Sequence, residues 1–427
     1  MQTQLSAEFQ GMPAGTAAAD ILSRCVHCGF CNATCPTYQL LGDELDGPRG
    51  RIYLIKQVLE GAEPTRKTQL HLDRCLTCRN CETTCPSGVQ YGQLLEIGRN
   101  IVEAKVERPS SEQAVRWLLK EGLTSPAFKP AMKIGQLVRP LLPASLKDKV
   151  PGKSPRQAHD WPLAAKTGAV GGKGGTGQAP RKMGLLLGCV QPAMLPNINS
   201  ATARVLDAAG IQTLVADGAG CCGAIRGHLN DHAGSLADMR RNIDAWWPLI
   251  DGPSEGGQIE ALVMNASGCG VTVKDYGRAL AEDPDYALKA ARVSAMTVDL
   301  SELLPSLVPL LKDRLAGKTL PKLAYHPPCT LQHGQQLRGD VESGMRELGF
   351  ELQLATCDSH LCCGSAGTYS VLQPVLSKQL RDQKLQALAP LEADTIVSAN
   401  IGCIQHLQSG TATPVRHWVE TLDEALA

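Results

Sequence analysis

The residues best suited to chemistry are seventeen cysteines in a chain of 427 residues. Eight of them form two runs of identical spacing, 25–36 (CVHCGFCNATCP) and 75–86 (CLTCRNCETTCP). In each run three cysteines follow one another at intervals of three residues, and a fourth precedes a proline. Three thiolates at this spacing allow one tight turn to hold three corners of an iron–sulfur cube, and in two-cluster ferredoxins the fourth thiolate binds the other cube.

The spacing therefore predicts two [4Fe–4S] clusters with crossed ligands. The first cluster would be held by Cys25, Cys28, Cys31 and Cys85, and the second by Cys75, Cys78, Cys81 and Cys35. A structural zinc site is the alternative. Zinc ribbons pair two Cys-x-x-Cys knuckles, however, and have no use for a third cysteine in register or for a trailing Cys-Pro.

A helix is expected between the two runs, because apolar residues recur there at helical spacing. Arg49 and Arg51 open this helix. They either lie beside a cluster, where their charge would tune its potential, or they are solvated residues at a helix start. The sequence leaves both interpretations open.

The other nine cysteines lie in the second half of the chain, which is a duplication. Each copy contains three short apolar runs separated by helical segments, a pattern typical of βαβ units and a parallel sheet. The matched cysteines are Cys189, Cys221, Cys222 and Cys269 in the first copy, and Cys329, Cys362, Cys363 and Cys403 in the second. Because they follow the expected strands, they should gather at the carboxyl edge of each sheet, where such sheets bind ligands.

Three interpretations of these thiols remain open. They could hold a further metal cluster, act as redox-active dithiols, or pack as inert buried thiols. Repetition at matched positions favours the cluster. Cys357 has no counterpart in the first copy and is either an additional ligand or merely buried. His406, three residues after Cys403, is either a ligand or a structural histidine.

Composition excludes several classes of function. Lys plus Arg and Asp plus Glu are balanced at 42 each, so nucleic acid is not an expected partner. No apolar run approaches the roughly 18 residues of a membrane-spanning helix, and residues 1–20 lack the pattern of a secretion signal. We therefore expect a cytoplasmic protein, whose thiols stay reduced, with any contact to the inner face of the cell membrane peripheral and made through partners.

These features divide the chain into five parts. We expect a two-cluster ferredoxin-type domain at 1–109, a helical connector at 110–150, a flexible linker at 151–182, a first cysteine repeat at 183–300 and a second at 301–427. The linker is rich in Gly, Ala, Lys and Pro, and its GGKGGTG stretch lacks the flanking strand and helix of a phosphate-binding loop. The predicted fold class is multidomain, α+β and α/β, with a helical N-terminal module and duplicated parallel sheets.

The chain resembles the family of iron–sulfur proteins that join a two-cluster ferredoxin module to repeats containing Cys-Cys-Gly (CCG). This family includes heterodisulfide reductase subunits, the small subunit of anaerobic glycerol-3-phosphate dehydrogenase, lactate-utilisation proteins and the iron–sulfur subunits of glycolate oxidase (glycolate dehydrogenase). The likeness is greatest to the last group, in segments such as CVHCGFCNATCPTYQLLGDELDGPRGRIYLIKQVLEG, HLDRCLTCRNCETTCPSGV and SHLCCGSAGTY. It spans nearly the whole chain and is weakest across residues 105–182.

The resemblance implies an electron-transfer subunit without catalytic residues of its own. FAD-binding partner subunits would oxidise glycolate to glyoxylate, and this chain would pass the electrons to a respiratory acceptor such as quinone. A complex that oxidises lactate or glycerol 3-phosphate, and a thiol–disulfide reductase that uses the CCG cysteines, are the alternatives. In heterodisulfide reductase relatives each CCG repeat ends in C-x-x-C and can hold an unusual [4Fe–4S] cluster. Here that last cysteine is missing after both Cys269 and Cys403, so the sequence does not decide whether the repeats bind a further cluster.

Overall fold

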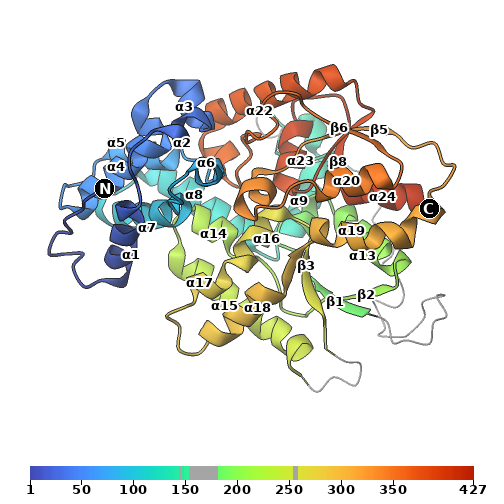
Figure 1. The fold of residues 1–427 in the computed structure, drawn as a ribbon, viewed down its shortest axis with the longest axis horizontal. Helices are drawn as coiled ribbons and strands as arrows, with labels where there is room; N and C mark the ends of the chain where they lie inside the picture. Colours follow the sequence, from blue (N-terminus) through green and yellow to red (C-terminus); the bar gives the residue numbers. More distant parts are fainter. Residues whose placement is uncertain (144–146, 148, 153–180, 253–257) are drawn as a thin grey trace.

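The computed structural model describes residues 1–143, 147, 149–152, 181–252 and 258–427. It has a helical N-terminal part on one side and two sheets surrounded by helices on the other (Figure 1). Most of the expected linker, 151–182, lies outside the described residues. Among the helices within the described ranges, none is both long enough and apolar enough to cross a membrane.

Short helices form the N-terminal part because prolines and cysteine loops interrupt the chain at close intervals. The helices are α1 (Pro13–Ser23), α2 (Phe30–Ala33), α3 (Pro36–Leu41), α4 (Pro48–Leu59), α5 (Arg66–Asp73), α6 (Asn80–Thr84) and α7 (Tyr91–Lys105). Proline occupies the first position of α1, α3 and α4, where its missing N–H costs no hydrogen bond. The apolar face of α4 packs on α7 so closely that a Cβ at Gly98 would lie 2.5 Å from Ile55.

Two further helices connect this part to the sheets. They are α8 (Ser110–Thr124) and α9 (Phe128–Leu137). The helix α8 contacts α14 (Ala224–His228), and α9 contacts α12 (Gln191–Met194). Both α12 and α14 follow strands of the first sheet. Ion pairs strengthen the first contact, since Arg226 on α14 bridges to Glu121 on α8 at 3.1 Å.

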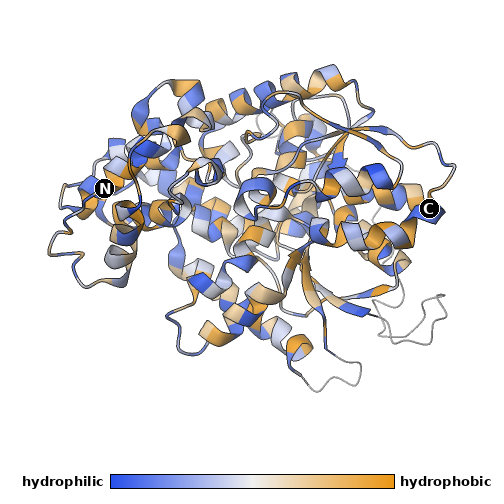
Figure 2. Cartoon of the chain, viewed as in Figure 1, coloured by the Kyte–Doolittle hydropathy of each residue, from blue (hydrophilic) through white to orange (hydrophobic). Residues whose placement is uncertain are grey.

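Both sheets are parallel and have the same strand order. The first contains β1 (Arg181–Leu185), β2 (Ile211–Leu214), β3 (Ala261–Met264) and β4 (Thr297–Asp299) in the order β2-β1-β3-β4. The second contains β5 (Lys322–Tyr325), β6 (Glu351–Leu354), β7 (Thr395–Ser398) and β8 (Val415–His417) in the order β6-β5-β7-β8. The central strand β3 is buried and apolar along its length (Figure 2). The predicted fold class, a helical module followed by duplicated parallel sheets, is confirmed.

Helices cover these sheets in the alternating order that the sequence predicts. In the first repeat, after α12, they are α13 (Asn197–Ala208), α14, α15 (His232–Ile250), α16 (Ser267–Lys274), α17 (Tyr276–Ala279), α18 (Ala287–Met296) and α19 (Leu300–Leu311). In the second repeat they are α20 (Asp340–Glu347), α21 (Tyr369–Leu372), α22 (Pro374–Leu388), α23 (Ile401–Gln408) and α24 (Trp418–Leu426).

The two repeats exchange a helix. The helix α19, which follows β4 of the first sheet, packs on α20 beside the second sheet. Reciprocally, α24, which follows β8 of the second sheet, packs on α13 beside the first. Arg204 on α13 donates to Asp423 on α24 at 2.8 Å, and the indole of Trp418 is wholly buried there. One continuous apolar core therefore serves both repeats.

Candidate metal centres

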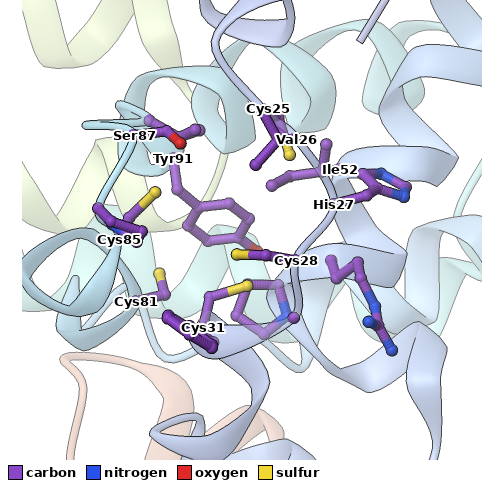
Figure 3. A pocket seen from close by; sticks show the side chains of 16 residues that line it. Cys25, Val26, His27, Cys28, Cys31, Ile52, Cys81, Cys85, Ser87 and Tyr91 are labelled. Atoms are coloured by element: carbon purple, nitrogen blue, oxygen red, sulfur yellow. The ribbon is translucent and has the colours of Figure 1, made fainter.

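The first group of cysteines comes together at the surface of the N-terminal part. Cys25 follows α1, Cys31 lies in α2, and Cys85 ends α6, with Cys28 in the loop between. These four cysteines line a cavity beside the ring of Tyr91, and Cys81 from the second run lines it as well (Figure 3). Burial, and then the thiols of Cys25, Cys85 and Cys28, raise the pKa of the Cys31 thiol to about 11.

The second group lies deeper. Burial, together with the neighbouring thiols of Cys78, Cys75 and Cys35, raises the pKa of Cys81 well above its ordinary value. The Tyr91 hydroxyl lies 3.6 Å from the Cys75 sulfur, so the tyrosine that lines the cavity of the first group also contacts the second. The structure thus brings the eight cysteines together in two crossed groups, and that these groups bind metal stays a prediction.

Both cysteine loops share an unusual backbone. The second and fourth residues after the first cysteine have positive φ in each run: His27 (57°) and Gly29 (86°), and Thr77 (53°) and Arg79 (58°). Alternation of right- and left-handed residues turns backbone N–H groups toward one concave side, an arrangement that favours anions and is found at iron–sulfur sites. At Gly29 space demands glycine as well, because a Cβ would lie 2.5 Å from the Arg49 guanidinium.

Two arginines lie beside the two groups. Arg51 is wholly buried, so the interpretation of this residue as solvated is wrong. Although burial opposes it, the neighbouring Tyr91, Cys75 and Cys35 raise the pKa of the Arg51 guanidinium, which stays charged beside the second group. Arg49 is half-exposed and lines the cavity of the first group. A fixed positive charge near each group would stabilise the negative charge of a cluster.

The second group borders the second sheet directly. Burial and then the thiol of Cys329 raise the pKa of Cys78 well above its ordinary value, and Cys78 also neighbours Cys362. Leu76 packs in the same apolar cluster as these thiols. The Thr83 hydroxyl and His333 Nδ1 are 2.9 Å apart across the same junction. The N-terminal part and the second repeat therefore meet at their cysteines.

The matched thiols of the first repeat form one group at the carboxyl edge of its sheet. Cys189 follows β1, Cys221 and Cys222 follow β2, and Cys269 lies in α16 after β3. The thiols of Cys189 and Cys222 donate hydrogen bonds to the Cys221 sulfur, and this lowers the pKa of Cys221 to about 3. The Cys222 sulfur in turn contacts that of Cys269.

The second repeat repeats this arrangement with deeper burial. Cys329 Sγ and Cys362 Sγ are 3.7 Å apart, and close contacts join Cys362 to Cys363 and Cys363 to Cys403. All four side chains are buried. Cys357 is exposed, so the expectation that it is buried is wrong, whereas its role as an additional ligand stays a prediction. All seventeen cysteines are free thiols.

Two histidines of the second repeat have different surroundings. His406 is a structural residue, because its Nε2 lies 3.1 Å from both the hydroxyl and the carbonyl of Ser377. His326, which the sequence reasoning did not single out, lies instead beside the thiols of Cys363 and Cys403. Its signal was available, since a histidine ends a buried apolar run where the first repeat has Leu186.

Comparison with known proteins agrees with this architecture. A family described as "4Fe-4S dicluster domain" matches residues 21–89, and one described as "Cysteine-rich domain" matches 183–274 and 323–408. These domains identify an iron–sulfur protein and account for both cysteine-rich halves of the chain.

Curated relatives cover the whole chain. The "Glycolate oxidase iron-sulfur subunit" of Escherichia coli (strain K12) is 52% identical over 427 residues, which are 100% of this chain and 99% of the relative. The "Probable glycolate oxidase iron-sulfur subunit" of Bacillus subtilis (strain 168) is 29% identical across 91% of this chain and 89% of its own. "Lactate utilization protein A" of Geobacillus thermodenitrificans (strain NG80-2) is 26% identical, across 57% of this chain and 98% of its own. The chain belongs to the family of glycolate oxidase iron–sulfur subunits.

Proposed function

We propose that this chain carries electrons from FAD-binding partner subunits, which oxidise glycolate to glyoxylate, toward a respiratory quinone. One observation carries the proposal: two crossed groups of four cysteines lie in one module, the first at the surface and the second against the second repeat. In this proposal Cys25, Cys28, Cys31 and Cys85 ligate one [4Fe–4S] cluster, and Cys75, Cys78, Cys81 and Cys35 ligate the other.

Electrons would enter at the first cluster. Cys28 is exposed, and two large apolar side chains beside it, Val26 and Phe30, are 69% and 61% exposed. Apolar side chains exposed around a redox centre favour docking of a protein partner. The second cluster would then pass electrons inward, because Cys78 adjoins the thiols of the second repeat.

The substrate chemistry would take place on the partner. Oxidation of glycolate removes two electrons and two protons, whereas a [4Fe–4S] cluster carries one electron at a time. A flavin accepts the pair and releases the electrons singly, so the organic step belongs to that cofactor. Glycolate is favoured over lactate because the relative named for glycolate oxidase matches the whole chain at twice the identity of the lactate-utilisation protein.

Thiol–disulfide reduction by the CCG cysteines has less support. A dithiol that exchanges with a substrate disulfide must be accessible to it. Both pairs, Cys221 with Cys222 and Cys362 with Cys363, are 3% exposed or less. Their burial fits a bound cofactor better than a reactive dithiol.

The experiment separates substrate oxidation from electron transfer. In the purified complex, Cys81→Ser should leave glycolate able to reduce the flavin under anaerobic conditions, observed as flavin bleaching. The same variant should lose glycolate-dependent quinone reduction, because the second cluster is interrupted. Cys357→Ser, at an exposed thiol that is not among the eight proposed ligands, is the matched control and should retain both activities.

Two outcomes would contradict the proposal. Normal quinone reduction by the Cys81→Ser complex would show that electrons bypass the second cluster. Loss of flavin bleaching in a correctly assembled complex would show that this chain takes part in glycolate oxidation itself.

A further inference from the structure

His326 is a buried histidine that lacks ordinary partners. It follows β5, is 1% exposed, and neither ring nitrogen has a hydrogen-bond partner within the described structure. A buried polar group left without a hydrogen bond destabilises the fold, so such groups usually serve a purpose. The other buried histidines of the same repeat differ, because each has at least one polar partner at about 3 Å: His333, His406 and His417.

The unpartnered ring faces two thiols. One ring nitrogen of His326 and the sulfurs of Cys363 and Cys403 all lie within 4.8 Å of one another. Metal–ligand bonds of about 2.0–2.3 Å in a tetrahedral site place two donors roughly 3.3–3.8 Å apart. The 3.7 Å between the sulfurs of Cys329 and Cys362 falls in the same range. The eight N-terminal cysteines form no comparably close trio among the described residues, in keeping with the wider spacing of cube corners.

A buried cation accompanies this group of donors. The Lys384 ammonium is 3% exposed and donates to the carbonyls of Asp358 and Ser359. It also interacts electrostatically with the thiols of Cys363 and Cys362. Thiolates in a low-dielectric interior need such compensation, so the site is built for negatively charged sulfur ligands.

The first repeat has other residues at the positions of His326 and Lys384. Three residues before the first cysteine of each repeat stand Leu186 and His326. Ser235 in the first repeat and Ser377 in the second each donate to the glycine carbonyl of the CCG triplet, so the two serines correspond. Seven residues after them stand Asn242 and Lys384. The duplication has therefore diverged at these two positions. Near the thiols of the first repeat, His228 and Arg241 come from other positions: His228 interacts with Cys221, and Arg241 donates to the Cys221 carbonyl.

We propose that the second repeat binds a third iron centre in which His326 is a nitrogen ligand beside Cys363 and Cys403. Iron suits mixed imidazole and thiolate ligation, and histidine raises the reduction potential of iron–sulfur centres. Cys329 and Cys362 connect the site to Cys78, so an iron centre here would take one electron at a time from the reduced second cluster. Its role in electron transfer rests on the proposed function, whereas its metal content does not.

The test uses the anaerobically purified complex and compares four forms of this chain. They are the native chain, His326→Leu, which introduces the residue of the first repeat, His326→Cys, which replaces one donor by another, and the control His406→Asn. Iron, zinc and acid-labile sulfide are measured per chain, and low-temperature paramagnetic spectra are recorded. The spectra of the two N-terminal clusters report in each sample that the chain has folded.

The native chain should contain iron beyond that of two four-iron clusters. His326→Leu should lose this excess and its spectrum, while His326→Cys retains the iron with a changed spectrum and His406→Asn behaves as the native chain. In the native complex, labelling of histidine with ¹⁵N should reveal coupling of a histidine nitrogen to the third paramagnetic centre, which needs no variant.

Three results would overturn the assignment: no iron beyond the two N-terminal clusters, excess metal that is zinc, or a folded His326→Leu chain with unchanged iron and spectrum. All three leave the two N-terminal clusters in place, so they are distinguishable from failure of the proposed electron transfer.

Discussion

Replacement of Arg51 by glutamine should lower the reduction potential of the second cluster. The Arg51 guanidinium is wholly buried and interacts with Cys75 and Cys35, two of the proposed ligands. A reduced [4Fe–4S] cluster carries one more negative charge than the oxidised cluster. A fixed positive charge therefore stabilises the reduced form, and its removal makes reduction harder.

Coulomb's law gives the size of the shift. At an effective dielectric constant of about 20, two unit charges about 4 Å apart interact by about 4 kcal/mol, and at roughly twice that separation by about 2 kcal/mol. For a one-electron couple about 59 mV corresponds to a tenfold change in the equilibrium constant, so Arg51→Gln should lower the potential by roughly 90 mV. Asp46 is not left alone, because Arg74 donates to it at 2.8 Å.

The assay is a redox titration followed by low-temperature paramagnetic resonance, which resolves the two clusters. Arg51→Lys keeps the charge and should titrate close to the native chain. Arg49→Gln is the matched control at the first cluster, where half-exposure and the Glu44 partner at 2.6 Å screen the charge, so its shift should be about a third as large. If Arg51→Gln keeps both clusters and titrates like the native chain, the electrostatic role of Arg51 is refuted.

Two further predictions follow from the same geometry. Gly29→Ala should release iron from the first cluster, because φ is +86° and a Cβ there would lie 2.5 Å from the Arg49 guanidinium. Gly42→Ala, at φ +65° with open space around it, is the control and should keep its iron. Equal iron contents in the two variants would contradict this prediction. His417 is buried, which lowers its pKa to about 3 from an ordinary 6.5, so the neutral ring is favoured in the folded chain and stability is lost as pH falls below 6.5. Between pH 7 and 5 the free energy of unfolding should fall by about 2 kcal/mol from this residue. In His417→Asn, whose side chain can still accept the Val419 N–H, chemical denaturation at the two pH values should show the free energy of unfolding without this fall. If the variant and the native chain have the same pH dependence, His417 is not its cause.

Local patterns in the sequence predicted the parts of the molecule that depend on short segments. The crossed grouping of Cys35 and Cys85 was predicted from the spacing together with the ligand exchange of two-cluster ferredoxins, and each cysteine loop is a short stretch of chain with one repeated backbone conformation. Three strands of each sheet were visible as apolar runs. The fourth strands, β4 and β8, have only three residues each, too few for an alternation or a run to identify them.

Features that depend on packing between distant segments were not predictable in this way. A charged residue at a helix start is usually solvated, and only the contacts of Arg51 with α5 and the second cysteine loop show that it is buried. His326 looked like one more residue of an apolar run until β6 and β7 placed Cys363 and Cys403 beside it. The contact of α24 with α13 joins segments more than two hundred residues apart, which a single sequence does not reveal.

That exchange has a consequence for how the protein is made. When a ribosome has synthesised the first sheet, the side of α13 that packs on α24 has no cover, because α24 lies more than two hundred residues later in the chain. The first repeat therefore completes its folding only after the second has emerged, and the nascent chain exposes an apolar surface for that whole interval. A chaperone that holds this surface would thereby also keep the cysteines of both sheets accessible to the machinery that delivers iron and sulfide.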